Sequence, residues 1–318
     1  MKKFHMIIDL EKCAGCFNCF LACKDEHVGN EWLPYTKEQQ KHDLKWIDVK
    51  VHERGVAPYT EITYVTQTCQ HCDNAPCEKK YPEVFQKRSD GIMLIDINKA
   101  NDPKYADACP YGCVSWNETA QNVQKCTGCA HLIDGGWKEP RCVQACATRA
   151  MQTVFCEDAE WDRLVERQGL KPITDGSNKP RILYKNLYMY NKCFVKGVVS
   201  TYVDGLEEGV IDAKVELKIG NETIYECRTD YLGEFYIDRI PKNTGKMAVV
   251  ITAEGAEPLT RDFEIQDKSI VLDPILIGEG EAKANVILPN EHALQQALDH
   301  MTSYDAEDAR KAFAKEKK

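Results

Sequence analysis

The sequence predicts an α+β protein in which a cysteine-rich first half is followed by an all-β domain and a short helical tail. Three observations predict this order. Thirteen of the sixteen cysteines lie between residues 13 and 146. From about residue 194 the chain becomes a series of short segments in which apolar and polar residues alternate, as in strands with one solvated face. Near the C-terminus, apolar residues recur at the spacing of a helix face.

Composition and charge exclude several classes of protein. Hydrophobic residues make up 43% and charged residues 29% of the 318 residues, as in an ordinary folded protein. The net charge of -9 argues against a nucleic-acid surface, because phosphate binding needs a basic face. No segment has the apolar length of a membrane span, and the first residues do not resemble a signal peptide. We therefore expect a cytoplasmic protein without a direct membrane span, and export with a signal-bearing partner stays open.

The first cysteine run carries the most specific chemistry. Cys13, Cys16, Cys19 and Cys23 have the spacing C-x2-C-x2-C-x3-C, by which two-cluster ferredoxins bind 4Fe-4S clusters. In that arrangement the fourth cysteine serves the neighbouring cluster. The apolar runs FHMIIDL and GIMLIDI lead into cysteine-run positions, as a strand does in a ferredoxin βαβ unit. We therefore predict two ferredoxin-like repeats.

The later cysteines complete three predicted metal sites. In paired ferredoxin runs, the first three cysteines of one run bind a cluster together with the fourth cysteine of the partner run. We expect the first run to pair with the last, and the two inner runs to pair with each other. The three 4Fe-4S sites are then Cys13, Cys16, Cys19 and Cys146; Cys23, Cys126, Cys129 and Cys142; and Cys69, Cys72, Cys77 and Cys109.

The two inner runs lack all four cysteines that a fourth cluster site would need. The same spacing places Tyr81, Lys99, Asp102 and Tyr105 where four cysteines would otherwise stand. All four positions would have served one cluster, and this supports the pairing because independent losses would be scattered over several sites. Cys113 is an alternative to Cys109 as a ligand, although Cys109 fits the spacing better.

Residues beside the predicted ligands have simpler expected roles. Cys156, Cys193 and Cys227 are expected to be small buried hydrophobic residues. His71 and His131 adjoin predicted ligands, and we expect packing roles for both, with hydrogen bonds to cluster sulfur as the alternative.

Structural zinc and disulfide bonds are the alternatives to iron-sulfur clusters. C-x2-C pairs also form zinc ribbons, but zinc closes with four ligands and does not need the third cysteine of the first run. Zinc is the stronger alternative for the last group, which begins KCTGC. Disulfides are less expected, because thiols stay reduced in the cytosol. A zinc-stabilised scaffold whose β domain binds a partner is therefore an alternative function.

We predict four regions along the chain. Residues 1–156 form the iron-sulfur domain, and residues 157–193 form a linker that contains a helix at WDRLVERQGL. Residues 194–282 form an antiparallel β-sandwich or barrel, in which Ala213, Val215, Leu217 and Ile219 share one face of a strand. Residues 283–318 form a charged helical tail, with Asn290 as a candidate N-cap.

Several sequence motifs occur together in this chain. CQHCDNAPC, DGIMLID, CPYG, QKCTGCAHL and PRC are accompanied by EHVGNEW and KPRILYKNLY. With the vacated fourth site, they resemble the iron-sulfur subunits of the dimethyl sulfoxide reductase family of molybdopterin enzymes, and within it the small (beta) subunits of pyrogallol-phloroglucinol transhydroxylases. This resemblance extends over about residues 1–280. The segments GVV, DAKVEL and TDYLGEF resemble carboxypeptidase-regulatory-like repeats.

The resemblance implies an electron-transfer subunit with no catalytic residues and no organic cofactor of its own. Three 4Fe-4S clusters would pass electrons to or from a molybdenum bis(molybdopterin guanine dinucleotide) centre on a large catalytic subunit, in a heterodimer or a multiple of it. The implied reaction is hydroxyl transfer between polyhydroxylated aromatics, or a related dehydroxylation or hydroxylation. A respiratory reductase of the same family is the alternative partner.

Overall fold

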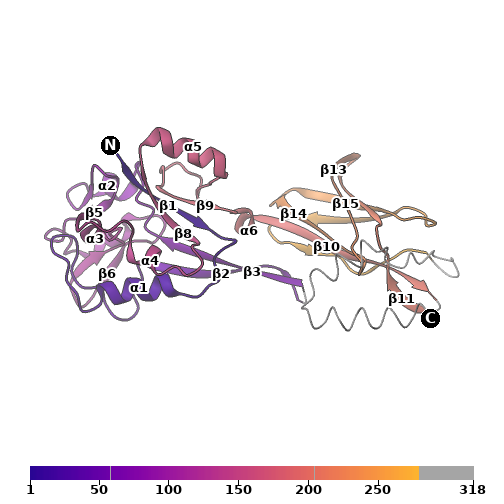
Figure 1. The fold of residues 1–318 in the computed structure, drawn as a ribbon, viewed down its shortest axis with the longest axis horizontal. Helices are drawn as coiled ribbons and strands as arrows, with labels where there is room; N and C mark the ends of the chain where they lie inside the picture. The colour runs from indigo at the N-terminus through magenta and orange to yellow at the C-terminus, as the bar shows by residue number, and fades with distance from the viewer. Residues whose placement is uncertain (58, 204, 279–318) are drawn as a thin grey trace. The chain divides into compact units, whose positions relative to one another are not determined.

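The chain forms two compact units (Figure 1). The computed structural model describes residues 1–57, 59–203 and 205–278. Unit 1 comprises Met1–Glu53 and Ile62–Tyr190, and unit 2 comprises Arg54–Glu61 and the chain from Asn191 onward. Helices and strands both occur, which confirms the mixed class. The predicted helical tail at 283–318 lies outside the described residues. No helix in the described part of the chain is long and apolar enough to cross a bilayer.

A three-stranded sheet organises unit 1. Its central strand β1 (Lys3–Asp9) pairs antiparallel with β8 (Met151–Cys156) and parallel with β9 (Ile182–Lys185). Successive side chains of a strand point to opposite faces, and both faces of β1 are covered. Phe4, Met6 and Ile8 enter the main core of the unit, whereas Ile7 packs with residues of and after helix α5 (Asp158–Gln168).

Strand β9 corrects one detail of the sequence interpretation. It lies within residues 157–193, which were expected to be a linker with a helix. The helix is present as α5, and it ends at Gly169, whose φ of 63° is the left-handed conformation typical of a helix C-terminus. The chain then returns to the sheet at Ile182, where Ile182 and Tyr184 are fully buried. Four residues are too short a run for an alternation pattern to be recognised next to a Pro- and Gly-rich stretch.

Short hairpins and helices complete unit 1. The helices are α1 (Asn18–His27), α2 (Pro76–Lys80), the 3-10 helix η1 (Pro103–Ala108), α3 (Ala130–Asp134), α4 (Arg141–Gln144) and, at the end of the unit, α6 (Tyr188–Asn191). The hairpins are β2 (Ile47–Val56) with β3 (Tyr59–Thr68), β4 (Phe85–Lys87) with β5 (Met93–Ile95), and β6 (Ser115–Asn117) with β7 (Asn122–Gln124). Residues 54–61 of the first hairpin belong to unit 2.

The described residues of unit 2 after α6 form strands in two sheets around one core. In the first sheet, β10 (Lys192–Val203) pairs with β11 (Leu206–Gly209), β14 (Glu234–Pro241), β17 (Ile270–Val271) and β18 (Ile275–Leu276). The second sheet has the order β13 (Glu222–Arg228), β12 (Lys214–Ile219), β15 (Gly245–Thr252) and β16 (Leu259–Ile265). Val195 and Phe235 of the first sheet and Val215 and Val249 of the second share the core.

Two features of unit 2 differ from the alternation pattern. Ala213, Val215 and Leu217 are buried as predicted, but Ile219 is 42% exposed because it is the last residue of its strand, next to the turn at Gly220. The sheets are also not wholly antiparallel, since β17 and β18 each pair parallel with β10. Strands of two residues carry no periodicity, so their direction could not be predicted.

Candidate iron-sulfur sites

The predicted ligands lie in or beside short helices of unit 1. Cys19 and Cys23 are in α1, Cys77 is in α2, Cys142 is in α4, Cys129 immediately precedes α3, and Cys109 immediately follows η1. Helix α1 contacts α4, and α2 contacts η1. The segments that carry the first and last cysteine runs therefore lie together, as do the segments that carry the two inner runs.

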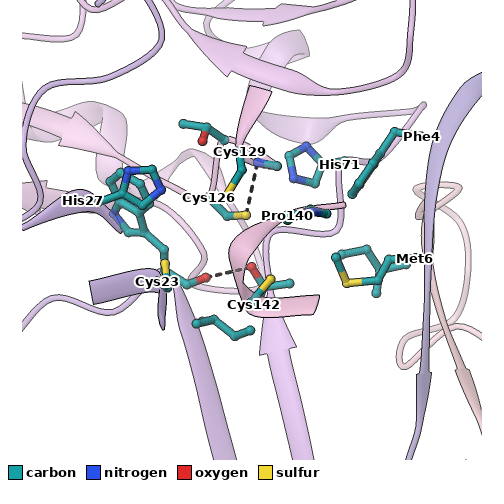
Figure 2. A pocket seen from close by; sticks show the side chains of 15 residues that line it. Phe4, Met6, Cys23, His27, His71, Cys126, Cys129, Pro140 and Cys142 are labelled. Carbon is teal, nitrogen blue, oxygen red and sulfur yellow. Dashed lines mark hydrogen bonds between the residues drawn. The ribbon is translucent and has the colours of Figure 1, made fainter. Parts of the chain in front are cut away.

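Four of the predicted ligands line a single cavity. Cys23, Cys126, Cys129 and Cys142 surround about 420 Å³ of space free of protein atoms, part of it open to solvent (Figure 2). They come from α1, from the loop before α3, and from α4. Spacing alone had grouped the same four cysteines. Four thiols from two facing runs are the donor set that holds a 4Fe-4S cluster in ferredoxins, so the residues fit that group.

Burial makes the thiols of this cavity difficult to ionise in the absence of a metal. Burial raises the pKa of Cys23 and of Cys142 well above the ordinary thiol value, and negative charge on Cys126 and Cys129 would raise both further. Burial also raises the pKa of Cys129 to about 12. Thiols that face one another away from water are difficult to ionise together. Coordination to iron would offset that cost, because metal-bound thiols are deprotonated.

Cys146 is distant from the first run in sequence but lies near it in space. Burial raises the pKa of Cys19 to about 11, and repulsion from Cys13, Cys146 and Cys16 adds to the increase. Cys146 therefore lies close enough to interact with the first run, although 123 residues of sequence separate it from Cys23. Gly15 is required in this run, since a Cβ at its φ of 64° would lie 2.4 Å from the ring of Tyr64.

The inner runs form a third cluster of thiols. Cys69, Cys72 and Cys77 are buried, and Cys109 is half-buried. Burial raises the pKa of Cys72 to about 12 and that of Cys77 to about 11, and both values are raised further by Cys69 and Cys109. In the described part of the chain, no three His, Cys, Asp or Glu side chains are gathered tightly enough to bind a single metal ion.

Cys113 acts as a hydrogen-bond donor beside the third thiol cluster. Its Sγ lies 3.3 Å from the carbonyl oxygen of Thr68 and 3.6 Å from that of Tyr111. A thiol has a single hydrogen to donate, so Cys113 facing these carbonyl oxygens is a protonated thiol. The thiolate is the form that binds metal, so this geometry is consistent with the prediction of Cys109 as the ligand.

We expect alanine substitutions to separate these two cysteines. Cys113→Ala should leave the iron content near that of the unmodified chain, whereas Cys109→Ala should lower it by up to about 4 atoms, the content of one cluster. Iron can be measured by mass spectrometry after anaerobic purification. Iron loss in Cys113→Ala with retention in Cys109→Ala would reverse the assignment.

Two of the four residues at the predicted vacated positions contact each other, and the other two form ion pairs with near neighbours in the sequence. The rings of Tyr81 and Tyr105 pack edge to face with centroids 4.8 Å apart. Asp102 accepts a hydrogen bond from the backbone N–H of Lys104 and forms an ion pair with its ammonium group at 2.8 Å. Lys99 forms an ion pair with Asp96 at 3.2 Å. Tyr81 and Tyr105 belong to different cysteine runs, so their contact supports the pairing of the inner runs.

Three cations lie near the inner run, and their roles were missed although Lys125 and Arg181 stand within the motifs QKCTGCAHL and KPRILYKNLY. Lys125 is 3% exposed and donates hydrogen bonds to the carbonyl oxygens of Met93 and Cys126. Lys87 donates to the carbonyl oxygens of His71 and Cys72 at 2.6 and 2.8 Å. Arg181 donates two hydrogen bonds to Asp73, at 2.7 and 2.8 Å. Lys87 and Arg181 thereby hold the loop between Cys69 and Cys77, whereas Lys125 connects Met93 with Cys126. The residue type alone does not reveal such roles.

The two histidines beside predicted ligands, and the three cysteines expected to be buried hydrophobic residues, lie in different environments. His131 lies with its Nε2 3.0 Å from Glu26 Oε1 and stacks on Trp32 at 4.4 Å. His71 lines the cavity of Figure 2. Cys156 and Cys193 are buried in hydrophobic clusters, and Cys227 is partly buried against one. No two of the sixteen cysteines, all of which lie in the described part of the chain, are joined by a disulfide bond.

Comparison with known proteins identifies the family of this chain. Residues 60–155 match a family described as a 4Fe-4S dicluster domain. The chain is 38% identical over 277 residues to the pyrogallol hydroxytransferase small subunit of Pelobacter acidigallici, an alignment that covers 86% of this chain and 98% of that protein. The chain belongs to this small-subunit family. The resemblance inferred from the motifs is thereby confirmed, and the chain is an iron-sulfur electron-transfer protein.

Two more distant relatives align with about half of this chain. A putative iron-sulfur subunit of dimethyl sulfoxide reductase from Halobacterium salinarum is 32% identical over 208 residues, covering 55% of this chain and 78% of that protein. One of the polypeptides of the anaerobic dimethyl sulfoxide reductase from Escherichia coli K12 is 32% identical over 165 residues, covering 47% of this chain and 72% of that protein.

Proposed function

We propose that this chain is the electron-transfer subunit of a heteromeric molybdopterin enzyme that acts on polyhydroxylated aromatics. The reaction would be pyrogallol-type hydroxyl transfer or a related dehydroxylation or hydroxylation. The match to a pyrogallol hydroxytransferase small subunit over 98% of its length carries this proposal. The active site would lie on a large partner subunit that holds a molybdenum bis(molybdopterin guanine dinucleotide) centre, because no catalytic motif occurs in this chain.

We further propose three 4Fe-4S clusters with the ligand sets predicted above. The cavity lined by Cys23, Cys126, Cys129 and Cys142 supports the second set. The mutual effects on thiol pKa values support the first and third sets. Such clusters supply one-electron transfer at potentials set by hydrogen bonds, charge and solvent exposure. The protein contributes the thiols, the covering side chains, the buried ammonium group of Lys125 and the partly buried one of Lys87.

The proposed reaction does not itself need an electron-transfer subunit. Net hydroxyl transfer between two aromatics leaves the number of electrons unchanged. An electron relay in this chain would therefore serve to set or reset the redox state of the partner's metal. We propose the cytoplasm as the compartment, because thiols stay reduced there. We also propose that the two-sheet part of unit 2 is a carboxypeptidase-regulatory-like sandwich that packs on or recognises the partner.

The decisive experiment is anaerobic purification of the intact complex followed by metal analysis. We expect roughly 12 iron atoms per copy of this chain, from three clusters of four, and molybdenum in a co-purifying large chain. About 4 iron atoms per chain would contradict the ligand sets. Zinc in place of iron, with no broad iron-sulfur absorbance, would instead favour the zinc-stabilised scaffold.

A respiratory reductase remains the second candidate, favoured by the 32% identity to two dimethyl sulfoxide reductase polypeptides. The same purified complex distinguishes the two. Consumption of pyrogallol without an external electron donor supports the aromatic hydroxyl transfer. Activity restricted to S-oxide reduction with a reduced dye as donor would support the reductase.

A further inference from the structure

Some of the residues that line the cavity of Figure 2 carry buried polar atoms without a hydrogen-bond partner. Among the described residues, a group of buried side-chain nitrogen and oxygen atoms has no hydrogen-bond partner. Four of them belong to residues that line this cavity, namely Nδ1 of His27, Nε1 of Trp46, Nε2 of His71 and Oγ1 of Thr127. Buried polar groups are normally paired, so such a concentration around one space indicates a bound group that pairs with them.

The hydrogen bonding of His71 defines which of its ring nitrogens carries the proton. The backbone N–H of Met93 donates to Nδ1 at 3.0 Å, so Nδ1 is the acceptor. A neutral imidazole has one acceptor and one donor nitrogen, which leaves Nε2 as an N–H donor. The residue is 1% exposed, and its ring also packs edge to face against Phe4 with centroids 5.5 Å apart. The hydrogen bond from Met93 and the packing against Phe4 therefore fix the orientation of the Nε2–H donor.

Trp46 supplies a second unpaired donor. An indole nitrogen can only donate, and Nε1 of Trp46 is buried without an acceptor in a residue that is 3% exposed. Its backbone carbonyl accepts a hydrogen bond from the hydroxyl of Thr68 at 2.8 Å. Its ring lies against His27, with centroids 4.6 Å apart. Sulfur atoms of a bound cluster are the acceptors that the chemistry of this cavity would provide.

We propose that His71 Nε2–H and Trp46 Nε1–H donate hydrogen bonds to sulfur atoms of the cluster held by Cys23, Cys126, Cys129 and Cys142, and thereby raise its reduction potential. This inference rests on the proposed ligand set of that site. Reduction adds negative charge to the cluster, so donors aimed at its sulfur atoms stabilise the reduced form more than the oxidised form. His71 lies between Cys69 and Cys72 in sequence and thus connects the second site with the segment that carries the third.

The test is a redox titration of the intact complex followed by electron paramagnetic resonance. His71→Asn can keep an acceptor for the Met93 N–H but is too short to replace Nε2, and Trp46→Phe removes the indole donor together with part of the buried ring volume. We expect each variant to lower one of the three midpoint potentials and to leave the other two unchanged. His71→Gln, whose amide can reach the position of Nε2, should restore part of the loss. Trp161→Phe is the matched control, because Trp161 is also buried but does not line the cavity.

The iron content of the complex distinguishes a failure of the proposed function from a failure of the hydrogen-bond inference. A wild-type complex without cluster iron would refute the proposed function, whatever the variants do. Unchanged potentials in both His71→Asn and Trp46→Phe, with full iron content, would overturn the hydrogen-bond inference alone. If either variant fails to retain its clusters, the wild-type complex labelled with 15N-histidine and 15N-tryptophan answers the question. Side-chain nitrogen coupling to a reduced cluster supports the inference, and its absence contradicts it.

Discussion

Replacing both Cys129 and Cys142 by alanine is expected to remove one entire 4Fe-4S cluster. The two thiols line the same cavity, and a cubane cannot be held by the two cysteines that remain. Iron should fall from roughly 12 to roughly 8 atoms per chain, by the content of one cluster. Metal analysis and the loss of one paramagnetic resonance signal from the reduced complex would measure this result.

The matched control replaces two buried cysteines that no predicted site uses. Cys156 and Cys193 are 2% and 1% exposed and belong to hydrophobic clusters. The variant Cys156→Ala/Cys193→Ala should keep its iron. Its stability should fall somewhat, because the smaller side chains leave space in the hydrophobic clusters. Full iron retention in the Cys129→Ala/Cys142→Ala variant would show that the cavity does not hold a cluster.

Replacing Arg181 by methionine is expected to loosen the loop that carries Cys72 and Cys77. The guanidinium is 2% exposed and makes two hydrogen bonds to Asp73 in that loop. The methionine side chain retains part of the apolar packing but neither bond. We expect a loss of about 3 kcal/mol in the stability of unit 1, typical of hydrogen bonds to charged groups after a discount for the partly exposed Asp73. Iron of the third site should also be released faster to a chelator.

Urea denaturation and chelator-induced bleaching, both under anaerobic conditions, measure these two effects. Arg228→Met is a suitable control, because Arg228 forms an ion pair with Asp212 in which both side chains are more than half exposed. Such a surface pair contributes at most about 1 kcal/mol. Equal bleaching rates for Arg181→Met and the unmodified chain would show that this arginine does not support the third site.

Local spacing in the sequence was sufficient to predict much of the candidate site. The interval between two cysteines in one run reflects the turn that the chain makes around a cluster, so it can be recognised from a few residues. The vacated positions Tyr81 and Tyr105 could be recognised for the same reason. Alternation likewise predicted the strand at Lys214–Ile219, because the side chains of a strand have a period of two.

Features that depend on distant contacts could not be predicted in this way. Strand β9 is short, and its burial follows from pairing with β1, about 175 residues earlier in the chain. The buried cations Lys125 and Arg181 stand within the motifs QKCTGCAHL and KPRILYKNLY, but those motifs do not show what the two side chains bind. Their role comes from carbonyl and carboxylate groups that the fold brings to them.

The sequence by itself therefore determined the kind of metal centre, the family and the candidate cysteines, since these depend on residue types at short, fixed intervals. Only the tertiary structure decided which other groups surround each centre. From the sequence, a hydrogen bond to cluster sulfur was an alternative role for His71, but only the fold shows that its Nε2 is buried and unpaired in a residue that lines the cavity of four thiols. Trp46 became a candidate donor from the fold alone. A hydrogen-bond partner is defined by distance and direction in space, and neither can be obtained from positions along the chain.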